Sequence, residues 1–437
     1  MTWTTPNFVA ICAIAAVAAP ATPGATYSVV AYMTGGPYHE PGTITEGSPG
    51  VFYSEAGGQT AFSVTAQGKL TTLATFGDPP TIDSYVLAAP NSLFYSSALS
   101  NGHSNVFSVG SQPGKEQTYP PQALFAGLVG NLPSGSLFGA ACPAGSSGAC
   151  SLATVDTNGG VTPFYQFPAT DYPYPPIYGP DRNYYGTAYT YGVAGTYLYK
   201  ATASGSLTKI ATMPFGTSGF VGVGLILQGS DGNFYGVQST GVGCSASNQH
   251  GAVYKLTPSG QFSILHDFGV CGNGVVNTLI QASDGKLYGA TQGNSLLFSL
   301  TTSGEYKALF KTTNGSTEGL CPCWLLQGSD GKLYGIAQGG GPTGDGVVFA
   351  LDAGLPAPKP QALEFSPASG AAGTKVRIWG RNLLQASAQF NGAAAAGVYN
   401  SGPNYVWATV PEGATTGPIT VTTPGGTSTT AASFTVQ

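Results

Sequence analysis

The chain has 437 residues, enough for two or three domains or for one long repeat array with an appended module. Only 8% of the residues are charged and 42% are hydrophobic, which excludes disorder driven by charge and allows a sizeable core. The net charge of -5, with only 14 Lys and Arg, argues against a surface that follows nucleic-acid phosphates, so we expect no nucleic-acid partner. The 24 Tyr and 21 Phe among many Gly and Pro residues predict an all-β fold with short turns.

Residues 1–25 are expected to be a signal peptide. The apolar run at 8–19 is too short to span a bilayer, and cleavage is expected after Ala18 or Ala25, although the residues before the run carry no Lys or Arg. Lipidation of Cys12 and a buried N-terminal helix are the alternatives. The sequence therefore predicts a secreted or cell-surface protein with no transmembrane segment after cleavage and with six cysteines available for pairing.

A block of eight residues recurs along residues 26–354. Its clearest copies are GSDGNFYG at 229–236, ASDGKLYG at 282–289 and GSDGKLYG at 328–335. Weaker copies precede these, and the final aromatic of the seven blocks recurs every 42 to 53 residues, at positions 53, 95, 138, 185, 235, 288 and 334. This period suits a unit of four short strands.

A second block follows each first one, as in VYKLTPSGQFSILHDFG at 253–269, where a Ser-Gly turn separates two alternating apolar runs. Four antiparallel strands in each of seven units predict a seven-bladed β-propeller. The seventh unit stops without a fourth strand, whereas YSVVAYM at 27–33 precedes the first unit. We expect Tyr27 to Met33 to pair with Val347 to Leu351, which closes the ring and leaves no exposed edge.

These copies resemble the GloVer tandem repeats of secreted bacterial proteins, through the SDGxLYG and VFKLTxxG signatures, over about residues 27–354. The resemblance is specific in units four to seven and looser in units one to three. It implies a secreted or surface location and brings no catalytic residue to this chain.

A Pro-rich linker, LPAPKPQ at 355–361, is followed by a module of different composition at 362–437. Short alternating strands between turn signals indicate a small β-sandwich. The motifs SPASG, GRNL, FNG, TGPITVTTPGG and FTV closely resemble the IPT/TIG family of immunoglobulin-like domains. That resemblance implies turns at Gly373 and Gly380, and a core made of Phe365, Val376, Ile378, Leu383, Phe390, Ile419, Val421, Phe434 and Val436. A spacer or docking role is the simplest interpretation, because such modules serve many functions.

The repeated aspartates, Asp231, Asp284 and Asp330, suggest calcium, but each block offers one carboxylate where calcium takes six to eight oxygens. Asp-Gly is the favoured pair of a type I′ hairpin, so we interpret these residues as structural. The sequence contains no paired carboxylates, no HExxH, no GxSxG and no phosphate-binding glycine loop. His266 and Asp267 are neighbours in a predicted strand and point to opposite faces, and His39 and His250 lie in loops. We therefore expect no catalytic residue, no metal site and no cofactor.

The cysteines are expected to form disulfides. Cys142 and Cys150 lie in one loop, and Cys244 and Cys271 lie in two loops of unit five that emerge on the same face, so both pairs are geometrically plausible. Cys321 and Cys323 remain as a short bridge, with zinc binding as a weaker alternative.

The face that carries these loops also carries the longest and least repetitive segments, at 169–179, 187–196 and 241–251. Long loops on a rigid scaffold commonly hold binding sites, and tyrosine rings stack on sugars or polymers. The candidate ligand-binding residues are Tyr172, Tyr174, Tyr189 and Tyr191. The sequence predicts a monomeric, secreted, non-catalytic recognition or scaffold protein for a glycan or protein ligand. The alternatives are a secreted carbohydrate-active hydrolase or lyase, and a purely architectural spacer.

Overall fold

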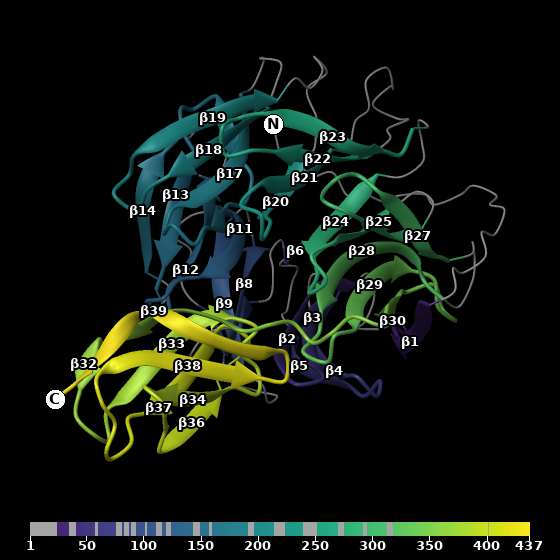
Figure 1. Ribbon diagram of the computed structural model, residues 1–437. Coiled ribbons are helices and arrows are strands. Elements are labelled where there is room, and N and C mark those ends of the chain that lie inside the picture. Colours follow the sequence, from purple (N-terminus) through teal and green to yellow (C-terminus); the bar gives the residue numbers. More distant parts are fainter. Residues whose placement is uncertain are drawn as a thin grey trace.

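A computed structural model gives the fold (Figure 1). The residues it describes are 24–34, 41–56, 60–75, 81–82, 87–88, 93–100, 103–110, 116–118, 124–142, 149–156, 160–190, 196–213, 223–238, 251–269, 275–291, 295–312, 318–400 and 402–437. The expected signal peptide and its cleavage sites lie almost entirely outside these ranges. Every element within them is a β-strand.

Seven antiparallel sheets follow the seven units of the sequence in order. Sheet one contains β2 (Pro41–Ser48), β3 (Val51–Ala56), β4 (Thr60–Thr65) and β5 (Leu70–Thr75). Sheet two contains β6 (Thr81–Ile82), β7 (Leu87–Ala88), β8 (Leu93–Ser100), β9 (His103–Gly110) and β10 (Glu116–Thr118). Sheet three contains β11 (Leu124–Asn131), β12 (Leu137–Cys142), β13 (Ser151–Val155) and β14 (Val161–Gln166). Sheet four contains β15 (Asp171–Pro173), β16 (Ile177–Tyr178), β17 (Tyr184–Thr190), β18 (Thr196–Ala201) and β19 (Leu207–Met213). Sheet five contains β20 (Val223–Gln228), β21 (Phe234–Gln238), β22 (Ala252–Leu256) and β23 (Phe262–Asp267). Sheet six contains β24 (Val276–Gln281), β25 (Leu287–Thr291), β26 (Leu296–Leu300) and β27 (Tyr306–Lys311), and sheet seven contains β28 (Leu320–Gln327), β29 (Leu333–Gly339), β30 (Val347–Asp352) and β1 (Thr26–Tyr32).

The predicted four-strand unit is confirmed, and the final aromatic of each block lies on the second strand of its sheet. Adjacent sheets pack through these rings. In the interface between sheets one and seven, for example, the rings of Phe52 and Tyr334 lie 4.2 Å apart.

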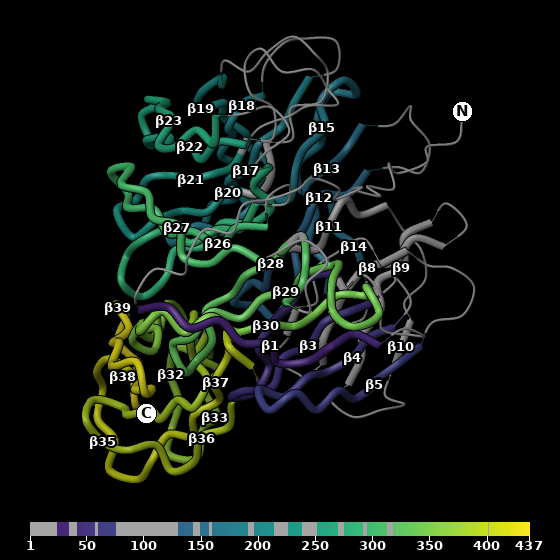
Figure 2. Tube along the Cα trace, turned by 90° about the vertical axis from the view of Figure 1, so that its right-hand side faces the viewer, coloured from purple at the N-terminus to yellow at the C-terminus, as the bar shows by residue number. Residues whose placement is uncertain are grey.

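The N-terminal strand closes the array as predicted. Strand β1 pairs with β30, with Tyr27 opposite Leu351 and Tyr32 opposite Val347. Figure 2 shows β1, in purple, running beside β30, in green. The two ends of the repeat region therefore share one sheet, and the outer edge of β30 is covered.

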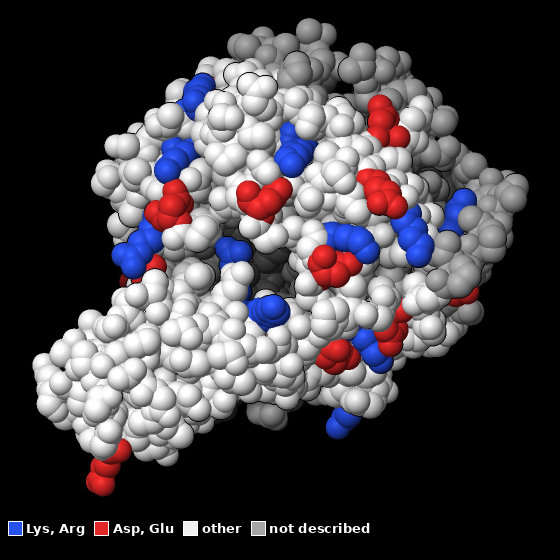
Figure 3. Space-filling view, viewed as in Figure 1, with Lys and Arg blue, Asp and Glu red and all other residues white. Residues whose placement is uncertain are grey.

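The repeated Asp stabilises the turn between the first two strands of its sheet. In unit five, Asp231 accepts hydrogen bonds from the backbone N–H of Asn233, at 3.1 Å, and from the hydroxyl of Tyr235, at 2.6 Å. The same pair of contacts recurs at Asp181, Asp284 and Asp330, each with the tyrosine four residues later. These aspartates are structural, as expected. Lysines pair with three of them, at Lys200, Lys255 and Lys286, and Figure 3 shows acidic and basic side chains side by side over the repeats.

The turn type differs from the predicted type I′. Type I′ needs positive φ at both central residues, but only Gly232 has it, at 79°, while Asp231 does not. Gly232 donates its N–H to the carbonyl of Gly229, which forms a type I turn followed by a left-handed glycine. An Asp-Gly pair suits either turn, and the acceptor role of the Asp side chain favours the observed one.

A glutamine or glutamate at the end of the first strand joins each of several sheets to its neighbour. The Gln281 side-chain oxygen accepts from the N–H of Ser230 at 2.7 Å, and that of Gln327 accepts from Ser283 at 2.9 Å. In the first sheet Glu46 occupies this position and accepts from the N–H of Ser329 at 2.7 Å. The contact between sheets one and seven, at the closure, is therefore made by a carboxylate.

The junction between sheets four and five lacks this bond. The side-chain oxygen of Gln228 is buried and without a hydrogen-bond partner. The residue that corresponds to Ser230 in the preceding unit is Pro180, which has no N–H to donate. The proline thus explains the orphan oxygen.

Replacing Pro180 with alanine should supply the missing donor. We expect a double-mutant cycle of Pro180→Ala with Gln228→Leu to give a favourable coupling of about 1 kcal/mol between the new N–H and the Gln228 oxygen. Urea unfolding of the four variants measures it. A coupling of zero would mean that the new N–H does not reach the oxygen.

The C-terminal unit consists of two further sheets, drawn in yellow in Figure 1. Their strands are β31 (Gln361–Ser366), β33 (Lys375–Arg381), β37 (Tyr405–Thr409) and β36 (Gly397–Asn400) in one, and β32 (Ser369–Gly370), β39 (Gly426–Val436), β38 (Gly417–Thr423), β34 (Ser387–Phe390) and β35 (Ala393–Ala394) in the other. The nine predicted core residues pack in one cluster between the sheets, with Phe365 and Val436 at its margin. Gly373 has the positive φ of a turn, but Gly380 lies inside β33, against the backbone of Gln361, rather than at the predicted turn.

The C-terminal unit packs against the tight turns of sheets three and four. The hydroxyl of Tyr405, a fully buried residue, donates to the carbonyl of Leu132 at 2.7 Å. The Arg377 guanidinium donates to the carbonyl of Pro133 at 2.7 Å, and the rings of Tyr178 and Trp379 meet edge to face at 5.8 Å. These contacts fix the module on the face opposite the ends of the strands that carry the long loops.

A strained residue takes part in this interface. Arg182 occupies the turn position where units five to seven have glycine, and its φ is 63°. A left-handed conformation is costly for a residue with a Cβ. Arg182 forms an ion pair with Glu364 of the C-terminal unit at 2.9 Å, which offsets part of that cost. The departure from the repeat thus coincides with docking of the module.

Tyr405→Phe tests how strongly the two parts are held together. We expect a loss of about 1 kcal/mol in the free energy of unfolding, because the Leu132 carbonyl loses one of its two donors and keeps only the N–H of Gly135. Denaturant unfolding measures the loss, and Tyr399→Phe, at an exposed tyrosine of the same unit, is the control. Equal stability of the two variants would contradict the role of this bond.

Candidate functional site

The candidate site lies at the end of sheet four that is remote from the C-terminal unit. The segment 169–179, predicted as a long loop, instead contains two short strands, β15 and β16, which both pair with β17. The prolines of this segment are tolerated because these strands form the edge of their sheet, where an N–H is not required.

The pairing brings three of the four candidate tyrosines together. Tyr172 lies directly opposite Tyr189, and their rings stack 5.1 Å apart with an angle of 15° between their planes. Tyr174 lies 6.0 Å from the Tyr189 ring. All three side chains are half-buried, whereas Tyr191 lies outside the described residues. The three rings form a small aromatic cluster, which we call the tyrosine cluster.

Burial changes the acidity of two of these phenols. It raises the pKa of Tyr174 to about 12, and it also raises the pKa of Tyr189. Both groups therefore stay protonated at neutral pH and serve as neutral hydrogen-bonding groups. Tyr174 is the more enclosed of the two, so Tyr172 and Tyr189 are better placed to meet a ligand than Tyr174.

A buried carboxylate lies beside the tyrosine cluster. Asp171, 3% exposed, accepts hydrogen bonds from the hydroxyl of Tyr197 at 2.5 Å and from that of Thr190 at 2.8 Å. The Lys209 ammonium lies 3.6 Å from this carboxylate and 3.7 Å from the centre of the Tyr197 ring. Burial acts to raise the pKa of Asp171, but the hydrogen bonds and Lys209 outweigh it and hold the pKa low. An ionised carboxylate so fully bonded anchors β15 to β17 and is unsuited to proton transfer.

The histidines do not form an acid–base pair in the described residues. The ring of His266 stacks on Tyr306 at 4.1 Å, while Asp267 accepts from the N–H of Gly269 at 2.8 Å. Burial lowers the pKa of His266, which favours the neutral ring. His39 and His250 lie outside the described residues. His266 and Asp267 thus contact different neighbours.

One of the three predicted disulfides is observed. Cys142, at the end of β12, is bonded to Cys150, just before β13. Cys244 and Cys271 lie outside the described residues. The predicted bridge between Cys321 and Cys323 is wrong, because Cys323 carries a buried thiol that is not in a disulfide, and burial raises its pKa to about 12. Positions 321 and 323 lie two residues apart on β28, and an extended backbone separates such Cα atoms by about 6.6 Å, beyond the usual disulfide separation of about 5.5–6 Å.

No group of three or more His, Cys, Asp or Glu side chains capable of holding a metal ion occurs in the residues that the structure describes. Those residues also contain no helix long and apolar enough to cross a membrane.

The repeated four-stranded antiparallel sheets define an all-β protein whose fold matches β-propeller structures. Virginiamycin B lyase from Staphylococcus aureus is similar over 75% of this chain and 98% of its own, with a TM-score of 0.55 and 15% identity. The WD40 β-propeller domain of Doa1 is similar over 74% of this chain and 96% of its own, with a TM-score of 0.51 and 9% identity. Puromycin hydrolase is similar over 78% of this chain but 58% of its own, with a TM-score of 0.53 and 15% identity. At these identities the likeness concerns the fold alone.

Residues 190–405 match the family model described as the Gloeobacter/Verrucomicrobia repeat, which supports the resemblance of the repeated blocks within that range. The match begins at the end of β17 and extends through the linker into β37. No curated protein matches the chain.

Proposed function

We propose that the protein is a secreted or cell-surface recognition protein without catalytic activity, which binds a glycan through the tyrosine cluster. Its architecture is a closed seven-bladed β-propeller followed by an immunoglobulin-like domain of the IPT/TIG type. Seven sheets in sequence order, closed by the pairing of β1 with β30, support the propeller. Two sheets packed over one core, together with the sequence motifs, support the immunoglobulin-like domain.

The observation that carries the function is the stacked pair of Tyr172 and Tyr189. Both residues are partly exposed at the end of the sheet, and we expect the exposed parts of their rings and their hydroxyls to contact the ligand. A tyrosine face covers the C–H bonds of a sugar ring, and its hydroxyl bonds the sugar hydroxyls, at a small entropic cost.

The charged groups around the cluster support binding rather than turnover. A glycosidase needs two carboxyl groups facing one substrate bond, one of them able to carry a proton. Here Asp171 is held ionised by Tyr197, Thr190 and Lys209, and it is buried. The fold itself does not distinguish an enzyme from a binding protein, because the similar structures include a lyase, a hydrolase and a WD40 domain.

A glycan and polysaccharide array on the full chain tests the proposal. We expect saturable binding that is lost in Tyr172→Ala, is retained in Tyr172→Phe, which keeps the ring, and is unchanged in Tyr399→Ala. Tyr399 is a suitable control because it is 57% exposed and lies on the C-terminal unit. An array without binding, or binding that survives Tyr172→Ala, would refute the site.

The same samples distinguish recognition from the alternative function, a carbohydrate-active hydrolase or lyase. Incubating each bound glycan with the protein and measuring new reducing ends or unsaturated products detects turnover. Release of product would replace the recognition function with the enzymatic one.

A further inference from the structure

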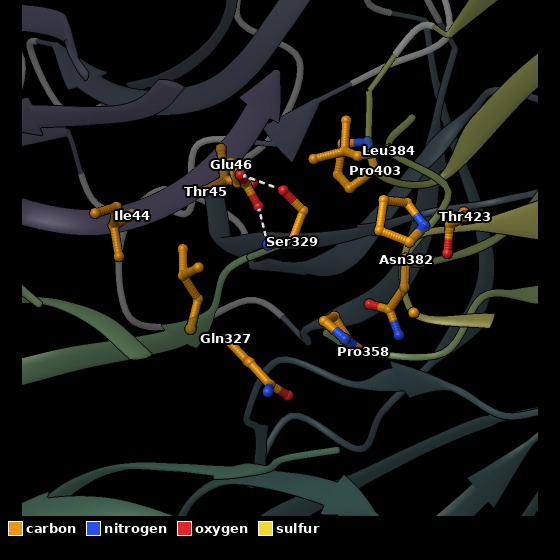
Figure 4. A pocket seen from close by; sticks show the side chains of 13 residues that line it. Ile44, Thr45, Glu46, Gln327, Ser329, Pro358, Asn382, Leu384, Pro403 and Thr423 are labelled. Atoms are coloured by element: carbon orange, nitrogen blue, oxygen red, sulfur yellow. Dashed lines mark hydrogen bonds between the residues drawn. The ribbon is translucent and has the colours of Figure 1, made fainter. Parts of the chain in front are cut away.

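A cavity lies between the closure of the repeat array and the C-terminal unit, on the side away from the tyrosine cluster. Its volume is about 170 Å³, close to that of a cavity that holds one benzene molecule, about 150 Å³. Figure 4 shows its lining, with Glu46 and Ser329 on one side and Thr423, Asn382 and Pro403 on the other. The walls are largely apolar, with contributions from Ile44, Leu326, Pro358, Leu384, Pro403 and Pro424.

A buried carboxylate forms part of this wall. Glu46 is 7% exposed, and its carboxylate accepts three hydrogen bonds, all from uncharged donors: the N–H of Gly50, the N–H of Ser329 and the hydroxyl of Ser329. No Lys or Arg pairs with Glu46 in the ranges that the structure describes. A buried charge is costly when no opposite charge accompanies it. Burial accordingly raises the pKa of Glu46, against the effect of these hydrogen bonds.

The repeat shows that this charge is not needed to join the sheets. At the equivalent positions, Gln281 and Gln327 make the same junction with neutral amides, and their Nε2 atoms donate to the carbonyls of Gly285 and Gly331. Gln327 lines the cavity as well as Glu46, so lining the cavity does not by itself require a carboxylate. In the first sheet Gly50 instead donates its N–H to the side chain, so this position needs a second acceptor there but no charge.

A second polar group in the cavity lacks a partner. Thr423, at the end of β38, is 8% exposed, and its hydroxyl is buried without a hydrogen-bond partner. Thr423 lines the cavity on the side of the C-terminal unit (Figure 4). An unsatisfied buried hydroxyl costs about 1–3 kcal/mol, and a bound molecule with a donor or an acceptor removes that cost.

We propose that this cavity binds a small primary ammonium compound with a hydroxyl group on a short apolar chain. The ammonium lies against the Glu46 carboxylate, the carbon chain contacts the proline and leucine walls, and the hydroxyl meets Thr423. Because Glu46 belongs to the first sheet and Thr423 to the C-terminal unit, the ligand bridges the two parts of the molecule. The site is independent of glycan binding at the tyrosine cluster.

Calorimetric titration of the full chain at pH 8 with 3-hydroxypropylammonium chloride tests this site. We expect saturable 1:1 binding, weakened at least tenfold by Glu46→Gln, which keeps an acceptor for the N–H of Ser329 as Gln281 does for Ser230. Thr423→Val keeps the shape of the side chain and should weaken this probe about fivefold, the worth of one hydrogen bond of about 1 kcal/mol, without affecting n-propylammonium. Glu305→Gln, at an exposed glutamate of sheet six, should bind as the unmodified chain does.

Three results would overturn the proposal. The first is binding by Glu46→Gln with unchanged affinity, and the second is equal binding of propan-1-ol, which has the chain and hydroxyl but no charge. The third is no saturable heat up to 20 mM probe, a concentration chosen as roughly the weakest useful affinity for so few atoms. The melting temperature of each variant, measured alongside, shows whether it is folded. If Glu46→Gln does not fold, the conservative Thr423→Val variant still tests the proposal.

Discussion

Replacing Glu46 with alanine should lower the free energy of unfolding by about 2 kcal/mol, because it leaves three donors at the closure without an acceptor. Two of them, the N–H and the hydroxyl of Ser329, belong to sheet seven, whereas Gly50 belongs to the turn of sheet one. The substitution thus weakens the contact at which the first and last sheets meet. Urea unfolding monitored by tyrosine fluorescence measures the loss.

Glu46→Gln is the matched variant, since glutamine occupies the same position in sheets six and seven. Glutamine keeps an acceptor for Ser329 and removes the buried charge. The pKa of Glu46 is raised by burial, so the folded protein binds more protons than the unfolded one, and its stability falls as the pH rises from the unfolded pKa, 4.5, through the folded pKa. We therefore expect the stability of Glu46→Gln relative to the unmodified protein to increase across that window and to stay constant above it. If the difference in unfolding free energy between the two proteins does not change with pH, the pKa of Glu46 is the same in the folded and unfolded states.

The sequence predicts the repeat architecture well because its signals are local and occur seven times. An aromatic on each second strand, a glycine in the turn of five units and a β1 sequence resembling a fourth strand all indicate one sheet per unit. The junctions between sheets were missed, although a signal exists. Gln228, Gln281 and Gln327 each precede Ser-Asp-Gly by two positions, and Glu46 stands at the corresponding place.

The candidate site was harder to predict because its contacts are between strands. The prolines of DYPYPPIY favour a loop by composition, and only the position of β15 at the edge of its sheet makes a strand possible. The stacking of Tyr172 on Tyr189 follows from the register of β15 on β17, which no local pattern specifies. Docking of the C-terminal unit left one trace in the sequence: Arg182, in a turn position that favours glycine.

Tyr27→Ala should lower the free energy of unfolding by about 3 kcal/mol, because it removes a half-buried ring at the closing strand. The Tyr27 ring stacks on Phe310 at 4.1 Å and on Phe349 at 5.3 Å, and its hydroxyl donates to the carbonyl of Glu318. Phe310 belongs to sheet six, so this side chain ties β1 to the neighbouring sheet as well as to β30. Tyr27→Phe should cost only about 1 kcal/mol, the hydroxyl contact alone. Ser28→Ala, at an exposed position of the same strand, should cost little.

The loss of stability in Tyr27→Ala should first appear as local opening of β1 and β30, before the whole array unfolds. Strand β1 is held by one sheet neighbour, β30, so weakening it exposes the backbone of Val347 to Leu351 first. Amide hydrogen exchange followed by mass spectrometry should show faster exchange in peptides from β1 and β30 of Tyr27→Ala than in peptides from β21 and β22 of sheet five. Uniform acceleration over all sheets would contradict a local opening and would mean that β1 separates only when the whole array unfolds. Unchanged exchange together with unchanged stability would show that the pairing of β1 with β30 does not depend on the Tyr27 ring.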